Sequence, residues 1–246
     1  MDPKAAIVNP RKGKRSPDIG PVAVMVSSRL DMDLLVRELN IPKNDFHQLS
    51  MSRLYNGPGG ISVTGPFIGA PYATMLLEDL IAWGARRILF FGWAGTLVEE
   101  VAIGDLLVAG GAFIDEGTSG HYSGAGRGDL ATAPGEVTDR LRTDLSRAGI
   151  AHHGGEVWST DAIYRETHEK VAYFREKSAL AVEMELSAMF TVAAFRNVEM
   201  GALLAISDDL SGEAWRPGFG DKRFKETRKR VAGLIPGICE GLSAGL

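Results

Sequence analysis

Residues 87–97 read RILFFGWAGTL, and this stretch decides the expected fold. It opens with an apolar run bounded by charge, which is typical of a strand in the middle of a parallel sheet. The Gly-rich segment 92–95 follows, at the strand end where open α/β sheets bind their ligands. The stretch therefore predicts a buried central strand that leads into a ligand site.

The segments on either side alternate between strand and helix patterns. Strands are expected at 22–26, 61–64, 105–109, 155–158 and 202–206, and helices at 31–39, 71–83, 134–148, 185–196 and 224–242, the last bent at Pro236. Residues 110–128 show neither pattern and are expected to form a loop. The alternation predicts one α/β domain at 21–246, with a mostly parallel, twisted central sheet flanked by helices, preceded by a basic N-terminal arm at 1–20.

Composition narrows the function classes. The 246 residues are 45% hydrophobic and 24% charged, which allows a full core, and the net charge of −4 gives no reason to expect a nucleic-acid or membrane partner. The single cysteine, Cys239, excludes an intramolecular disulfide and a multi-cysteine zinc site. No signal-peptide pattern follows the basic arm, so a cytoplasmic protein is expected.

Glycine is in excess, with 30 residues against about 17 expected at ~7% usage. Sixteen of them lie between Gly57 and Gly128, where they would let the backbone approach a ligand closely. The sequence contains no P-loop and no nucleophile elbow, and the missing dinucleotide fingerprint disfavours a dinucleotide oxidoreductase. The adjacent His152 and His153 diverge on any regular element, so no metal site is expected.

Two acidic segments carry the chemistry. Glu183 and Glu185 precede an apolar helix, where carboxylates are costly to bury without hydrogen-bond partners. A ligand rich in hydroxyl groups would supply such partners, and the alternative is an exposed acidic helix start. Asp208 ends the strand at 202–206, where sites form in open sheets, and the alternative is a turn or helix-capping residue.

The order of these motifs resembles the nucleoside phosphorylase and nucleosidase superfamily over roughly residues 20–242. The resemblance rests on Val-Glu-Met-Glu at 182–185, Ile-Ser-Asp at 206–208, the Gly-rich segment 92–97 with Ile-Gly-Asp at 103–105, and the segments 115–122 and 158–164. It implies cleavage of the N-glycosidic bond of a purine or related nucleoside, with phosphate as co-substrate and with no metal or organic cofactor. It also implies a homodimer or homohexamer.

The resemblance also implies roles for individual residues. Glu185 would bind the ribose hydroxyls, with Met184 beneath the sugar, Glu183 in support and His121 as a further ribose contact. Asp208 would be the acid for the leaving base, and carboxylate near the sugar would stabilise its developing positive charge. The other base-binding candidates are Trp158, Ile163, Tyr164, Arg165, Ser207 and Arg216, and the phosphate-binding candidates are Arg29, Gly92, Ala94, Gly95 and Thr96.

The phosphate site departs from the family pattern. A Gly-Asp-Pro-x-Arg loop is replaced by Ser27-Ser28-Arg29-Leu30-Asp31, and Phe90 stands where an arginine is usual. The sequence therefore favours a phosphorylase, leaves hydrolysis by water open, and keeps a non-catalytic nucleoside-binding protein as the third possibility.

Overall fold

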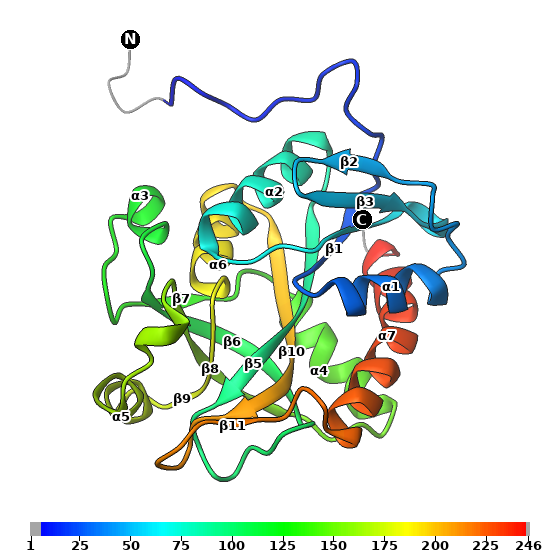
Figure 1. Cartoon of the computed structure of the whole chain (residues 1–246). Helices are drawn as coiled ribbons and strands as arrows, with labels where there is room; N and C mark the ends of the chain where they lie inside the picture. Colours follow the sequence, from blue (N-terminus) through cyan, green and yellow to red (C-terminus); the bar gives the residue numbers. More distant parts are fainter. Residues whose placement is uncertain (1–5, 245–246) are drawn as a thin grey trace.

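The computed structural model describes residues 6–244. It contains the strands β1 (Val22–Val26), β2 (His47–Leu49), β3 (Ser52–Asn56), β4 (Ile61–Gly65), β5 (Arg87–Thr96), β6 (Leu106–Asp115), β7 (Leu130–Thr132), β8 (His153–Thr160), β9 (Ala179–Glu183), β10 (Glu199–Asp209) and β11 (Arg216–Pro217). Its α-helices are α1 (Arg29–Glu38), α2 (Ala70–Trp83), α3 (Ser119–Ser123), α4 (Val137–Arg147), α5 (His168–Glu176), α6 (Leu186–Phe195) and α7 (Lys222–Ser243), and short 3₁₀ turns lie at Pro58–Gly60 and Ile163–Arg165. Figure 1 shows the helices arranged around one central sheet.

The sheet partly closes on itself. Its strand order is β11-β10-β6-β8-β9-β5-β1-β4-β3-β2, and β10 also pairs with β5. This additional pairing closes β10, β6, β8, β9 and β5 into a ring. A ring of this kind has no free edge between its members, so it forms a rigid frame for residues at the strand ends.

The single α/β domain agrees with the sequence prediction, but the sheet is mixed rather than mostly parallel. Among the described residues, five strand pairings are parallel and six are antiparallel. Closing the ring requires the antiparallel pairs β10–β6 and β5–β9, and the β2–β3–β4 meander adds two more. Apolar periodicity does not report strand direction, so these pairs were not predicted.

Two strands run further than the sequence predicted. The Gly-rich segment 92–95 continues β5 as far as Thr96, because β10 and β9 pair with it. Residues 110–115 likewise extend β6, which β8 holds by parallel pairing. The strands β2, β3, β7 and β11 and the helices α3 and α5 were not expected, since they are short or strongly polar. Strand β9 was not expected either, although it is apolar and as long as β1. The last helix runs through Pro236 to Ser243.

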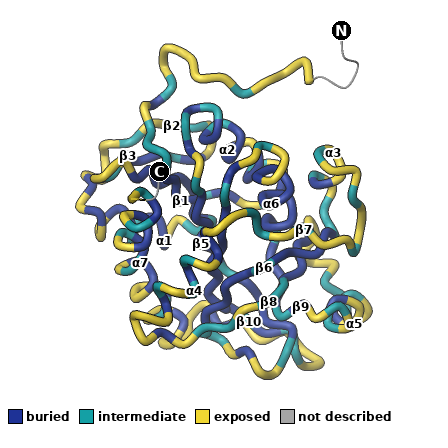
Figure 2. Tube along the Cα trace, turned by 180° about the vertical axis from the view of Figure 1, so that it is seen from behind, coloured by how far each residue is buried: buried dark blue, intermediate teal, exposed yellow. Residues whose placement is uncertain are grey.

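Helices cover both faces of the sheet. One apolar cluster joins the sheet to α2 and α6, and a second joins it to α1, α4 and α7. Figure 2 shows the buried residues concentrated along the central strands, while the segment leading from the N-terminus to β1 is largely exposed. No helix in residues 6–244 combines the length and apolar character needed to cross a bilayer.

A buried ion pair links the two ends of the chain. Asp31 on α1 accepts a hydrogen bond from Arg228 Nε on α7 at 2.6 Å, and both side chains are almost inaccessible to solvent. Trp93 Nε1 on β5 donates to the second carboxyl oxygen of Asp31, and the Arg228 guanidinium lies 4.7 Å from the Trp93 ring centre. Burial raises the pKa of Asp31 despite these partners. Asp31 and Arg228 therefore hold the indole of Trp93 in place.

Candidate active site

A cavity of about 390 Å³ lies where several strands end. Its walls come from the segments after β1 and β4, from β5 and β10 near their ends, from the β9–α6 junction, and from the loops after β8 and β10. The lining residues are Ser27, Ser28, Phe67, Ile68, Trp93, Ala94, Gly95, Ile163, Glu166, Val182, Glu183, Met184, Glu185, Ser207, Asp208, Trp215 and Phe219. The two acidic segments that the sequence singled out thus face one cavity.

Glu183 is held by the protein itself. One carboxyl oxygen accepts hydrogen bonds from the backbone N–H groups of Glu185 and Leu186, at 2.7 and 2.8 Å, and the other accepts one from the Ser159 hydroxyl. Burial raises the pKa of Glu183 above its usual range. Because these donors lie in the first turn of α6, Glu183 fixes the backbone that carries Met184 and Glu185.

Glu185 is 5% exposed and lines the cavity. The backbone N–H of Gly69, just before α2, donates to its Oε1 at 2.6 Å. Burial, and then the neighbouring charge of Glu183, raise the pKa of Glu185 well above its usual range. An ionised carboxylate here is stabilised by further hydrogen-bond donors, and the vicinal hydroxyls of a sugar provide two at the right spacing.

Asp208 is positioned by an irregularity of β10. The pairing with β5 shifts register between Ile206 and Asp208, so that both Ser207 and Asp208 face the cavity. The Ser207 hydroxyl donates to one carboxyl oxygen of Asp208, and Trp215 Nε1 donates to the other at 2.8 Å. A Cβ on Gly95 would lie 2.5 Å from Leu210 Cδ1 and 2.8 Å from Asp208 Oδ2, so a side chain there would displace these two side chains.

Some base-binding candidates lie elsewhere. Trp158 is fully buried. It lies on β8, one of the strands that form the ring, and the Trp158 indole stacks on Phe174 with ring centres 4.6 Å apart. Tyr164 is 96% exposed, next to Ile163, which does line the cavity. Arg165 lines a separate surface hollow with Arg127.

Arg216 pairs with Asp209 and not with Asp208. The reason is the antiparallel register of β11 and β10, in which Arg216 stands directly opposite Asp209. The ribose candidate His121 is exposed on α3 and does not line the cavity.

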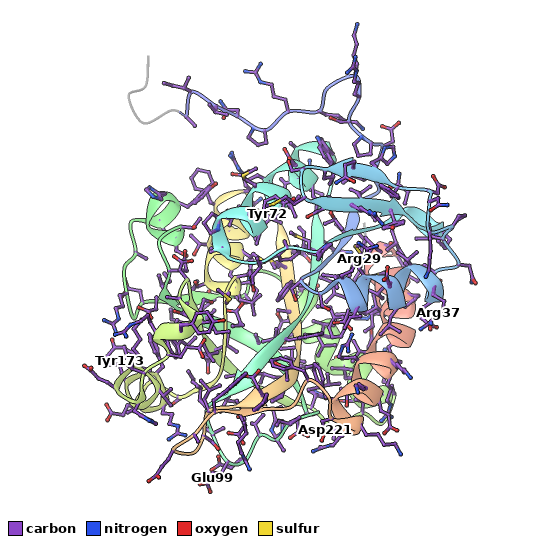
Figure 3. The ribbon with its side chains drawn as sticks, in the orientation of Figure 1. Arg29, Arg37, Tyr72, Glu99, Tyr173 and Asp221 are labelled. Atoms are coloured by element: carbon purple, nitrogen blue, oxygen red, sulfur yellow. The ribbon has the colours of Figure 1, made fainter. Side chains whose placement is uncertain are left out.

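Of the five phosphate-binding candidates, only two line the cavity. Ala94 and Gly95 line the cavity, whereas the Thr96 hydroxyl is buried and donates to the Val98 carbonyl at 2.9 Å. Arg29 lies on α1, exposed and paired with Asp33 (Figure 3). At Gly92 a Cβ would lie 2.4 Å from the ring of Phe90.

Phe90 is fully buried, and its ring centre is 5.8 Å from that of Phe67, which lines the cavity. The position where the family has an arginine thus lies behind Phe67 and does not line the cavity.

Several lining residues were missed from the sequence. Trp215 and Phe219 lie on either side of β11, and two aromatic residues in a Gly- and Pro-containing segment were an available signal. Glu166, after the turn at Ile163–Arg165, is a half-buried carboxyl with nothing in the local sequence to mark it. Within the described part of the chain, the cavity is lined by four carboxyls and by no Lys or Arg. No group of three potential metal ligands occurs among residues 6–244.

The chain is similar in sequence to known nucleoside phosphorylases. Guanosine phosphorylase of Halorubrum lacusprofundi is 29% identical over 173 residues, 69% of each chain. A DeoD-type purine nucleoside phosphorylase of an Exiguobacterium species is 28% identical over 151 residues, and the match spans 61% of this chain but only 63% of that relative, slightly under two thirds of its length.

Solved structures show the same fold. Uridine phosphorylase of Vibrio fischeri superposes with a TM-score of 0.75 at 25% identity, covering 91% of both chains. Purine nucleoside phosphorylase of Toxoplasma gondii gives 0.77 at 18% identity, covering 93% of this chain and 94% of that one. The family model described as the phosphorylase superfamily matches residues 21–242. With a match over nearly its whole length, the chain belongs to the phosphorylase superfamily.

Proposed function

We propose that this protein is a nucleoside phosphorylase that cleaves the N-glycosidic bond of a purine nucleoside, with phosphate as co-substrate, to give the free base and ribose 1-phosphate. The observation that carries the proposal is that Glu185 and Asp208 line one cavity, together with Met184. The relatives named as guanosine and purine nucleoside phosphorylases support the same chemistry. No organic cofactor or metal takes part in the proposed reaction.

Each group has a distinct task. Glu185 accepts the ribose hydroxyls, and its negative charge favours the oxocarbenium-like transition state of bond cleavage. Glu183 holds the α6 start and so positions Glu185. Asp208 lies at the base end, where Ser207 and Trp215 fix its carboxyl group beside the departing purine. Trp93, Phe67 and Phe219 exclude water from the sugar and the base.

Hydrolysis is the second candidate, favoured by one observation. Phosphate binding in proteins relies on cations and backbone N–H groups, and no Lys or Arg of the described residues lines this cavity. Phe67 and Trp93 line the cavity with aromatic rings, and Phe90 packs behind Phe67. Water needs no such cations.

The two functions are separated by measuring base release from a panel of purine and pyrimidine nucleosides with and without phosphate. Phosphorolysis predicts release that depends on phosphate and yields ribose 1-phosphate. Release at the same rate without phosphate would instead establish a nucleosidase. Nucleoside binding with no release under either condition would indicate a non-catalytic binding protein and contradict both.

A neighbouring subunit is one source of the missing cation. We propose a homodimer or homohexamer, located in the cytoplasm, in which the partner completes the phosphate end of the site. Native mass spectrometry with and without phosphate tests this assembly. A monomer with full phosphate-dependent activity would contradict it.

Asp208→Asn is expected to lower kcat for purine nucleosides by about 10²-fold at pH 7.5, with KM changed only a few-fold. The amide keeps the shape of the carboxyl group but loses its charge and its ability to take part in proton transfer. Asp209→Asn on the same strand is the matched control for site chemistry, because its carboxyl pairs with Arg216. Unchanged kcat in Asp208→Asn would remove Asp208 from the reaction.

A further inference from the structure

Ser159 is a buried serine that does not line the cavity but contacts Glu183, which does. It lies on β8 and is inaccessible to solvent. In the parallel pairing of β8 with β9, Ser159 stands directly opposite Glu183. Its hydroxyl donates to one carboxyl oxygen of Glu183, while backbone N–H groups of the α6 start donate to the other. The register of the sheet therefore brings a hydroxyl group to a carboxyl group of the cavity wall.

The same hydroxyl also accepts a hydrogen bond. The backbone N–H of Ser187, in the first turn of α6, donates to Ser159 Oγ at 2.8 Å. A serine hydroxyl has one proton to donate, and an ionised carboxyl group can only accept. Because Ser187 uses the acceptor side of the hydroxyl, its proton is directed at Glu183. Ser159 thus joins the end of β9 to the start of α6.

The segment between these two contacts carries the residues that face the ligand. Met184 and Glu185 lie between Glu183 and Ser187 in the chain, and both line the cavity. The first N–H groups of a helix have no partner within the helix itself. At α6 such groups are bound by Glu183 and Ser159. The backbone that carries Glu185 is therefore held at both of its ends.

The hydroxyl also stabilises the charge of Glu183. Burial raises the pKa of Glu183, and the hydrogen bond from Ser159 is the largest of the effects that lower it. A buried carboxylate that loses a donor is strongly disfavoured, so it takes up a proton or turns toward another partner. Either change alters the hydrogen bonds that Glu183 makes with the N–H groups of Glu185 and Leu186.

We propose that Ser159 is a positioning residue of the ribose site. By fixing Glu183 and the first turn of α6 together, it holds the Glu185 carboxyl group where the ribose hydroxyls bind. Small displacements of a binding group are costly for catalysis, so such support matters even without contact to the substrate. This inference rests on the proposed function, because it takes Glu185 as the acceptor of the ribose hydroxyls. It concerns ligands that contain the sugar, and free bases are unaffected.

The first test compares a riboside with a free base. The probes are 9-deazainosine, whose carbon–carbon glycosidic bond is not cleaved, and 9-deazahypoxanthine, which lacks the sugar. Ser159→Ala removes the hydroxyl with little change in volume. By calorimetry, the variant is expected to bind 9-deazainosine about 10-fold more weakly than wild type and 9-deazahypoxanthine within twofold. Equal losses of affinity for both probes would overturn the inference, because they would indicate a general structural defect.

The second test is a double-mutant cycle on base release from guanosine. Ser159→Ala is expected to lower kcat/KM by about 10–30-fold in the wild-type background. In the Glu185→Gln background the same change is expected to cost less than about threefold, since the carboxyl group that Ser159 positions is already gone. Losses that multiply fully in the double variant would overturn the inference, because Ser159 would then act independently of Glu185.

Ser62→Ala is the matched control for the loss of a buried hydroxyl. Ser62 lies on β4, is almost fully buried and donates to Asn56 Oδ1 at 3.1 Å, but it does not line the cavity. Its substitution is expected to leave kcat/KM within twofold of wild type. Urea denaturation of both serine variants measures the folded fraction. A loss of activity in Ser159→Ala that disappears after correction for this fraction would contradict a positioning role.

The two tests separate this inference from the proposed function. A protein that releases no base, but binds 9-deazainosine more weakly after Ser159→Ala, contradicts the proposed function and supports the positioning role. A protein that releases base, with Ser159→Ala equal to wild type in riboside binding and in kcat/KM, contradicts only the positioning role. A wild-type protein that neither binds the riboside nor releases base contradicts both.

Discussion

Glu185→Gln is expected to lower kcat/KM for ribonucleosides by about 10²–10³-fold, because the neutral amide cannot provide the charge that stabilises the developing oxocarbenium ion. It also replaces one acceptor of the ribose hydroxyls by a donor. The side chain keeps its volume, so the packing around the α6 start is preserved. Steady-state base release, measured for guanosine and for 2′-deoxyguanosine, gives the size of the effect.

Measurements on 2′-deoxyguanosine separate the two effects of Glu185→Gln, the loss of hydroxyl binding and the loss of charge. If Glu185 accepts the 2′-hydroxyl, the Glu185→Gln variant loses less on 2′-deoxyguanosine than on guanosine, since wild type has already lost part of the interaction. Glu99→Gln, in the exposed loop after β5, is the control for a surface carboxyl (Figure 3). Equal activity of Glu185→Gln and wild type would show that the ribose lies elsewhere.

The pH dependence of stability follows from the same carboxyl. Its pKa is raised in the native state, so between its unfolded and native pKa values the native state binds more protons than the unfolded state. The free energy of unfolding of the empty protein therefore falls as pH rises through this interval. Glu185→Gln should flatten that fall, as measured by denaturant titration at several pH values.

Asp31→Ala is expected to lower the free energy of unfolding by about 3–5 kcal/mol, because it leaves the buried Arg228 guanidinium without its carboxylate. Trp93 Nε1 loses its acceptor at the same time, so the cavity wall loses its support. Urea denaturation followed by tryptophan fluorescence measures the loss.

Two controls define what the ion pair contributes. Asp33→Ala, on the same helix, removes an exposed pair with Arg29 and should cost only about 0–1 kcal/mol. The double variant Asp31→Leu with Arg228→Met should regain most of the stability, because burial of the charges offsets their attraction. Equal losses in Asp31→Ala and Asp33→Ala would contradict this interpretation.

The parts of the site that the sequence predicted are those next to strong local patterns. Glu185 and Asp208 flank apolar segments whose type could be predicted, and both follow or end a strand, so their convergence followed from the α/β class. Glu166 and Trp215 lie in loops, where position depends on tertiary contacts that no local pattern encodes. The partner of Arg216 was ambiguous for a related reason, because only the register of β11 decides whether Arg216 pairs with Asp208 or with Asp209.

The same limit applies to the fold. Apolar runs predicted the buried strands of the ring, but the closure of β10 onto β5 joins segments more than a hundred residues apart. The buried Asp31 is a comparable case. Its partner Arg228 is distant in sequence, so an acid in the first turn of α1 resembles an ordinary favourable charge at a helix start.

The register shift in β10 makes the length of this strand part of its chemistry. In a regular strand, neighbouring side chains point to opposite faces, so Ser207 and Asp208 could not both reach the cavity. The extra residue places the acid and the hydroxyl that holds it on one side. A deletion of one residue here would leave a single side chain facing the ligand, whatever its identity. Substitution libraries, which conserve chain length, would leave this determinant unsampled.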